Sequence, residues 1–435
     1  MDMKSRAGTR WPLIALGVLL SLVAQRAAGQ TAPAAPSAAP TRVTLDQAID
    51  MALKHNHSLQ AARTMILQNQ ASEITANLRP NPTISGDTQF LPLFTPGDFN
   101  SNYLDNNAQF DLGVGYLFER GKKRQHRLQA AKDQTAVSVA QTSDNERTLT
   151  FNVASQFIAV LLAQANIELA DTDLKSFQQT LDIAEEQAKL GAMSGGDLLK
   201  IKLQLLQFQT DVSAAKLARI QALAGLRQLL GYDSVPENYE VVGDLEYKAV
   251  KVGKDELMAM ALRQRPDVRA AQLGITAAQS QLGLAEANGK RDVNASMNYS
   301  HVGSANSISI FGSIEMPIFD RNQGEIARNR YVVTQSQELS SEQNSLALTD
   351  VENSYESLHT NDEVVQLYQS GYLKEAEDSR DISQYAYQRG AASLLDFLDA
   401  ERSYRATELA YRQALASYMT SLEQLRQAVG TRSLP

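Results

Sequence analysis

Hydrophobic residues recur at helical spacing over much of the chain and at alternate positions in four short stretches. The clearest helical seam has apolar residues every three or four positions: Leu198, Ile201, Leu205, Phe208, Val212, Ala215, Ala222, Leu226 and Leu229. A weaker seam includes Phe397, Tyr404, Tyr411, Tyr418 and Leu425. This spacing is typical of helices that pack along their whole length. We therefore expect a long packed helix over each segment.

A longer stretch without helix breakers precedes each seam. No Gly or Pro lies from residue 122 to 190, and only Gly371 lies from residue 325 to 389. Because Gly and Pro are the strongest punctuators of regular structure, the sequence predicts two very long helices, the second almost unbroken. The first would be roughly 100 Å long, about three times the hydrocarbon core of a bilayer. Two such helices in one chain suggest a protein that bridges a wide aqueous gap.

A shorter helix is predicted at the start of each half. The first begins after Thr44, a good N-cap, and runs to about Leu78, before an Arg-Pro-Asn-Pro stretch. The second is predicted from about Asp255 to Ala287, before Asn-Gly.

The alternating stretches predict four strands. One face of the strand near residues 108–116 carries Ala108, Phe110, Leu112, Val114 and Tyr116. Similar alternation occurs at 293–300 and 308–314, and more weakly at 83–90. Transmembrane barrel strands and half-buried strands of soluble sheets share this pattern, and the pattern alone favours the soluble sheet.

The number of strands changes this balance. Four strands cannot close a barrel in lipid, since the smallest barrels need about eight, and open sheet edges do not survive in hydrocarbon. If the strands span a membrane, several chains must share one barrel. Two chains would supply about eight strands and three about twelve.

Short sequence blocks recur in the same order in both halves. Met-Ala-Leu at 51–53 returns 209 positions later, and Gly-Ala at 191–192 and Leu-Arg-Gln at 226–228 both return 199 positions later. The order of the blocks indicates internal duplication. We expect residues 42–240 to form a first structural repeat and residues 241–435 a second, each with a helix, two strands and two long helices.

The first 41 residues are not expected to belong to the fold. Three basic residues within the first ten precede an apolar segment at 11–24, and small residues follow at 27–29. This is typical of a cleaved secretion signal; a retained anchor is the alternative, although the segment is short for a span. We expect a signal peptide over 1–29 and a Pro/Ala linker over 30–41.

Composition and motifs narrow the function classes. The chain has no Cys, which excludes disulfides and a lipidated cysteine, and its net charge of −8 argues against nucleic acid. No run of 18 apolar residues follows the signal, so we expect no transmembrane helix. The five histidines lack metal-ligand spacing, and no catalytic motif is present. We therefore expect no enzyme, no metal site and no cofactor.

Taken together, the chain resembles the TolC-type outer-membrane efflux family over nearly all of residues 43–431. The resemblance rests on the duplicated openings TLDQAIDMAL and DELMAMAL, the segments LGAMSGGDLL and RGAASLLDFLD, and the helix ends LRQLLG and LRQAVG. The segment FDRNQG at 319–324 resembles the branch that serves heavy-metal resistance pumps of the RND type.

The resemblance implies a mainly α protein with a small β part that forms a homotrimer. Three copies would share a twelve-stranded β-barrel in the outer-membrane lipid, and their antiparallel helical hairpins would form an α-barrel across the periplasm. The hairpin tips would meet a periplasmic adaptor (membrane fusion) protein joined to an inner-membrane pump of the RND type. The chain would be a passive exit duct, for heavy-metal cations on the branch resemblance. The alternative is a soluble periplasmic scaffold or adaptor-like protein.

Carboxylates near the second predicted tip are candidate gate residues. Asp396 and Asp399 are three residues apart at the start of a helix and lie on one face. In a trimer they would form two acidic rings, which favour cations in pores, and by resemblance they match the acidic constriction at the periplasmic entrance. The alternative is an ordinary helix start, where the dipole favours acids.

The first tip carries Asp197, the counterpart of Asp396. The resemblance implies that an acid here holds the entrance shut through a tyrosine and an arginine of the other hairpin. Tyr387 stands at the tyrosine position, but Ala392 replaces the arginine found in some relatives. A hydrogen bond between Tyr387 and Asp197 is the part of this latch that the chain can still form.

The turns themselves are predicted at Gly191 and Gly390, where the backbone needs positive φ. The resemblance implies that these two glycines, with Ser194 and Ser393, form the tips that dock the adaptor.

Overall fold

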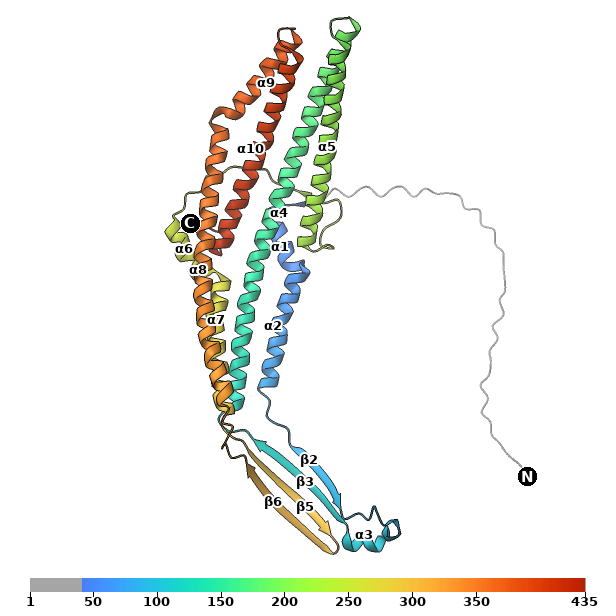
Figure 1. Ribbon diagram of the computed structural model, residues 1–435, viewed down its shortest axis with the longest axis vertical. Coiled ribbons are helices and arrows are strands. Elements are labelled where there is room, and N and C mark those ends of the chain that lie inside the picture. Colours follow the sequence, from blue (N-terminus) through green and yellow to red (C-terminus); the bar gives the residue numbers. More distant parts are fainter. Residues whose placement is uncertain (1–40, 435) are drawn as a thin grey trace, which may run out of the picture. The chain divides into compact units, whose positions relative to one another are not determined.

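The computed structural model of the chain describes residues 41–434, which form one compact unit. The predicted signal peptide and residues 30–40 of the predicted linker lie outside the described residues. Within the unit, helices lie side by side, and a four-stranded sheet lies at the end opposite the hairpin tips (Figure 1).

The elements of the first half begin with a short strand β1 (Arg42–Val43), followed by α1 (Leu45–His55), α2 (His57–Ala76), β2 (Thr83–Gln89), α3 (Ser101–Asn107), β3 (Gln109–Phe118), α4 (Lys123–Lys189) and α5 (Gly195–Leu230). A single 3₁₀ turn at Pro96–Asp98 precedes α3. The loop after α5 carries β4 (Glu240–Val241), which pairs in parallel with β1.

The second half follows the same order, without a counterpart of α3. Its elements are α6 (Lys254–Gln264), α7 (Pro266–Asn288), β5 (Val293–Val302), β6 (Ala305–Ile314), α8 (Gln323–Leu367), a π-helical turn (Tyr368–Tyr372), α9 (Leu373–Gln388) and α10 (Leu394–Val429).

The prediction of one continuous helix at the start of each half is wrong. The first helix breaks at Asn56, which is extended and whose side-chain oxygen accepts a hydrogen bond from the Leu59 backbone N at 3.0 Å, so it caps α2. The second breaks at Arg265, which is also extended. Residue 266 is proline, and the residue before a proline is pushed out of the helical region.

The prediction of a very long first helix is confirmed. Helix α4 is continuous over 67 residues, or roughly 100 Å. The second long stretch is interrupted, because Gly371 adopts a φ of 138° inside the π turn and separates α8 from α9. Gly371 was the one helix breaker that the sequence placed there.

The sequence predicts no helix that could cross a membrane, and α4 differs from that expectation. Among the described residues it is the one helix with an 18-residue window apolar enough to cross a membrane. Half of that window is buried within the chain, as in the core helix of a soluble protein. Its apolar character is therefore explained by packing against α1 and α5.

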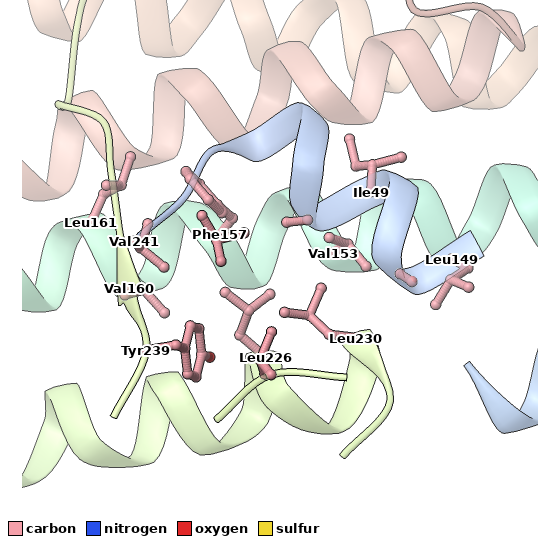
Figure 2. Close-up of a cluster of buried hydrophobic side chains, with 14 of the residues drawn as sticks. Ile49, Leu149, Val153, Phe157, Val160, Leu161, Leu226, Leu230, Tyr239 and Val241 are labelled. Atoms are coloured by element: carbon pink, nitrogen blue, oxygen red, sulfur yellow. The ribbon is translucent and has the colours of Figure 1, made fainter. Parts of the chain in front are cut away.

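One core cluster lies where α1 packs between α4 and α5 (Figure 2). Val153 and Phe157 of α4 meet Leu226 and Leu230 of α5, and all four are almost fully buried. Each buried side chain of this size contributes about 1.5–3 kcal/mol by leaving water. A second cluster joins α6, α8 and α10, and a third lies beneath the hairpin tips.

The four predicted strands are present in one antiparallel sheet of order β2-β3-β5-β6. The register places Ile84, Val114, Met297 and Ile310 in one row across the sheet. These side chains are exposed, from 46% for Val114 to 81% for Ile310. A soluble sheet buries its apolar face, so this sheet has the opposite arrangement.

Candidate functional site at the hairpin tips

Both hairpin tips are built on the predicted glycines. Gly191 ends α4 with a φ of 74°, and Gly390 ends α9 with a φ of 70°, so the predicted positive φ is confirmed. In each turn the next residue, Ala192 or Ala391, donates its backbone N–H to the carbonyl five residues earlier at 2.8 Å. This pattern satisfies the last helix carbonyls. Among the described residues, no atom lies within 4 Å of the place where a side chain would start at either glycine.

The two serines begin the returning helices. The Ser194 hydroxyl accepts a hydrogen bond from the Asp197 backbone N at 3.1 Å, and Ser393 accepts one from the Asp396 backbone N at 3.2 Å. The Asp396 carboxylate accepts hydrogen bonds from the Ser393 backbone N and hydroxyl at 3.2 and 2.7 Å, which completes a capping box. Asp396 therefore has the helix-start role that was the alternative for Asp396 and Asp399.

Both carboxylates are kept ionised by their partners. Lys200 donates to Asp197 at 3.0 Å, and this bond, followed by that from Ser194, holds the pKa of Asp197 below its usual range. Hydrogen bonds from Ser393 lower the pKa of Asp396. Asp399 is exposed, and its carboxylate makes no hydrogen bond or ion pair with any residue that the structure describes. The second tip therefore presents two carboxylates to solvent.

Tyr387 does not make the expected hydrogen bond to Asp197. Its hydroxyl is buried and has no hydrogen-bond partner among the described residues. Burial, and secondly the negative charge of nearby Asp197, raise the pKa of Tyr387. The ring lies on the Phe397 ring, with centroids 5.3 Å apart and planes 8° apart. The expectation of a hydrogen-bonded latch is wrong because the oxygens of Asp197 face Ser194 and Lys200.

An aromatic cluster joins the two hairpins beneath the tips. Phe397 of α10 stacks on Phe177 of α4 with centroids 6.3 Å apart, and Phe177 lies 4.8 Å from Phe208 of α5. All three rings are at least 97% buried. The sequence placed Phe208 and Phe397 in its seams but did not single out Phe177. Its signal is the helical spacing with Leu181 and Ala184, which are buried in the same cluster.

The opposite end of the unit holds a second pair of acids that the sequence analysis missed. Asp87 and Asp111 face each other across β2 and β3, on the face opposite the apolar row. Gln89 donates to Asp87 at 2.8 Å, and Gln109 donates to Asp111 at 2.7 Å. The sheet thus has one apolar face and one polar, acidic face.

A sequence profile of the outer membrane efflux protein family matches residues 48–232 and 257–431, most of the described fold. The chain belongs to this family. The cobalt-zinc-cadmium resistance protein CzcC of Cupriavidus metallidurans is 24% identical over 404 residues, which cover 92% of this chain and 91% of CzcC. The cation efflux system protein CusC of Escherichia coli K12 is 26% identical over 389 residues, 82% of this chain and 80% of CusC.

Solved efflux channels share the fold. A CusC crystal structure matches with a TM-score of 0.74 and 21% identity, and covers 89% of this chain and 92% of that one. The CmeC outer membrane channel of Campylobacter jejuni matches with a TM-score of 0.75 and 17% identity, and covers 89% and 85%.

The predicted family resemblance and the predicted efflux function are therefore confirmed. This family member is an outer membrane efflux protein, which is a transport protein and not an enzyme. The soluble periplasmic scaffold is not favoured.

Proposed function

We propose that three copies of this chain form a passive exit duct of a tripartite efflux system. The observation that carries this proposal is the four-stranded sheet with an exposed apolar face. Its edge strands, β2 and β6, each have one side without a partner among the described residues. Lipid does not tolerate open edges, and three sheets of four strands would close a barrel of about twelve.

The two faces of the sheet suit the two sides of such a barrel. The apolar rows, which include Val114, Met297 and Ile310, would contact lipid. The polar face carries Asp87, Asp111 and small residues, and it would line a water-filled lumen. The chain has no cysteine to carry a lipid, so the barrel would be its attachment to the outer membrane.

The helical part would continue the duct into the periplasm. Helix α4 alone is long enough to cross a wide aqueous gap. Three pairs of hairpins, α4–α5 and α9–α10, would form an α-barrel whose tips lie farthest from the sheet (Figure 1). The matching order of elements in the two halves supports internal duplication, with repeats at 42–240 and 241–435.

The tips would serve two purposes. Gly191, Ser194, Gly390 and Ser393 form exposed turns that would dock a periplasmic adaptor, which in turn would join an inner-membrane pump of the RND type. The entrance residues Asp396, Asp399, Asp197 and Tyr387 would surround the constriction. Asp396 and Asp399 fit this role because both carboxylates are exposed at the second tip.

Heavy-metal cations are the proposed cargo. CzcC and CusC are named for cobalt-zinc-cadmium resistance and for cation efflux, and the FDRNQG segment agrees with that branch. Acidic residues on the polar face of the sheet and at the tips would favour cations along the path.

A deletion strain tests the proposal. Susceptibility to cobalt, zinc, cadmium, copper and silver salts and to a set of antibiotics is compared in the deletion strain, the complemented strain and the parent. We expect metal sensitivity in the deletion strain that the wild-type chain restores. If the wild-type chain restores resistance to antibiotics but not to metals, the result would contradict the metal cargo and still support the exit duct. No phenotype, with the mature chain released in the soluble periplasmic fraction, would contradict the duct.

A further inference from the structure

A charged side chain joins the two hairpins below the aromatic cluster. Arg405 of α10 reaches both helices of the first hairpin. Its Nη1 lies 2.5 Å from Oδ2 of Asp211 on α5, and its Nε lies 3.4 Å from Oδ2 of Asp173 on α4. The guanidinium carbon also lies 5.0 Å from the centroid of the Phe208 ring. One residue of the second hairpin thus holds both helices of the first.

Two buried carboxylates near Arg405 lack a full set of hydrogen-bond partners. Glu401, one turn before Arg405, is 9% exposed, and its carboxylate makes no hydrogen bond or ion pair with any residue that the structure describes. Asp173 is 4% exposed, and its Oδ2 has no hydrogen-bond partner in the described part of the chain. Buried carboxylates without full partners are costly when ionised.

Burial raises the pKa of Asp173 to about 6 against the attraction of Arg405, Arg380 and Arg412. Burial, and then the charge of Asp173, raise the pKa of Glu401 to about 7. The cost of burial therefore exceeds the attraction to the arginines. The charged groups that act on the two acids are Arg380 and Asp381 of α9 and Arg405, Glu408 and Arg412 of α10. Asp211 of α5 pairs with Arg405, and Glu377 of α9 and Tyr404 of α10 lie against Arg380.

A kink lies beyond this cluster. Gly371, with its φ of 138°, interrupts the second hairpin between α8 and α9. Gln369, two residues before Gly371, donates to the Tyr411 hydroxyl at 3.1 Å, which marks the level of the kink on α10. Arg405 lies between that level and the tip. A swing of the distal part of the second hairpin about Gly371 would therefore break the contacts of Arg405.

We propose that Arg405, Asp173 and Asp211 form a clamp that holds the distal part of the second hairpin against the first, and that proton uptake by Asp173 and Glu401 tightens it. The inference rests on the proposed duct, in which separated hairpins widen the entrance. It adds a positioning residue that lies well below the tip and a dependence on periplasmic pH.

The direction of the pH effect follows from the two states. When the hairpins separate, water reaches both acids and their pKa values return toward 3.8 and 4.5. The clamped state then binds more protons between about pH 4.5 and 7. It is favoured as pH falls and weakened as pH rises through 6 and 7, on the order of tenfold or more between pH 5.5 and 8.

Single-channel recording in planar bilayers tests the clamp at pH 5.5 and 8.0. The wild-type protein should spend at least about tenfold more time in the conducting state at pH 8.0 than at pH 5.5. Glu401→Gln combined with Asp173→Asn should remove this pH dependence and keep the channel mostly shut at both pH values. Arg405→Met should raise conducting time at pH 8.0. Arg402→Leu is the matched control, because Arg402 is exposed and forms no ion pair with the described residues.

The outcomes separate the clamp from the duct. Wild-type channels whose gating is the same at both pH values, or a Gln/Asn variant that keeps the wild-type pH response, would overturn the clamp and leave the duct intact. Absence of channels from every variant would count against the duct. In that case, spin labels at Ala192→Cys and Ala391→Cys, in a chain without native cysteine, still report the separation of the tips. A separation that does not grow from pH 5.5 to 8.0 would overturn the clamp by itself.

Discussion

The ring of Tyr387 on α9 stacks on the ring of Phe397 on α10, with centroids 5.3 Å apart and planes 8° apart. Phe397 in turn stacks on Phe177 of α4 in the other hairpin. The hairpins of this efflux protein therefore meet through aromatic faces, and Ala392 cannot supply the arginine of a tip salt bridge. The contact between the two hairpins near the tips therefore rests on buried aromatic packing, and the Tyr387 hydroxyl has no hydrogen-bond partner among the described residues.

This contact predicts opposite outcomes for two aromatic substitutions. Tyr387→Phe should leave channel conductance unchanged and should not lower thermal stability, because it removes a buried hydroxyl that has no partner among the described residues. Phe397→Ala should lower the free energy of unfolding by about 3–5 kcal/mol, since it leaves a cavity in the cluster, and should raise conductance. Leu395→Ala, at a side chain that is 76% exposed, is the control for Phe397→Ala. Higher conductance of the Tyr387→Phe channel would support the hypothesis of a hydrogen bond between Tyr387 and Asp197.

The two acids of the second tip, Asp396 and Asp399, are predicted to limit conductance through their charge and not through helix capping. Asp396→Asn with Asp399→Asn removes two charges per chain while the amide at 396 can still accept from Ser393. We expect higher single-channel conductance and weaker block by divalent cations in planar bilayers. Because hydrogen bonds from Ser393 lower the pKa of Asp396, its charge and the block should persist as pH falls to about 5. Ser393→Ala removes the capping hydroxyl and keeps both acids, and an equal effect from it would contradict the role of charge.

The open space around the tip glycines predicts a docking defect without a folding defect. Gly191→Asp and Gly390→Asp each cost about 1–2 kcal/mol at positive φ but meet no neighbouring atom within the described residues. We expect normal oligomer yield, lost metal resistance, and lost co-purification of the adaptor. Asn at the same positions tolerates positive φ and adds no charge, so it should keep more activity. Full efflux with both Asp variants would remove the docking role.

Neighbouring residues of β6 predict which face meets lipid. Ile310→Arg should cost about 2–4 kcal/mol if the side chain lies near the bilayer midplane, and it should deplete the heat-modifiable oligomer in the outer membrane. Ser309→Arg, on the other face, should be tolerated. The relative amounts on gels without and with heating measure the difference. Equal tolerance of both arginines would indicate a sheet in water.

Much of the fold was predictable because local sequence determines it. Absence of Gly and Pro predicted α4, and alternation predicted the four strands whose register places Val114 beside Met297. Gly191 and Gly390 were predictable because few residues other than glycine accept positive φ. The break at Arg265 also had a local signal in the following proline, but the continuous helical pattern hid it.

The contacts between hairpins were not predictable in the same way. Asp173 and Arg405 are far apart in the sequence, and no periodicity shows that α4 and α10 bring them together. The position of the Tyr387 ring was also set by packing, since it stacks on Phe397 and its hydroxyl makes no hydrogen bond with the described residues. Sequence spacing placed these residues on helices, and tertiary packing determined their partners.

The most direct test of the shared duct is the mass of the mature protein extracted from the outer membrane, measured by native mass spectrometry in detergent. We expect a particle of three chains, dissociating on heating, that inserts into liposomes and conducts ions. A water-soluble monomer that does not bind bilayers would contradict the central claim.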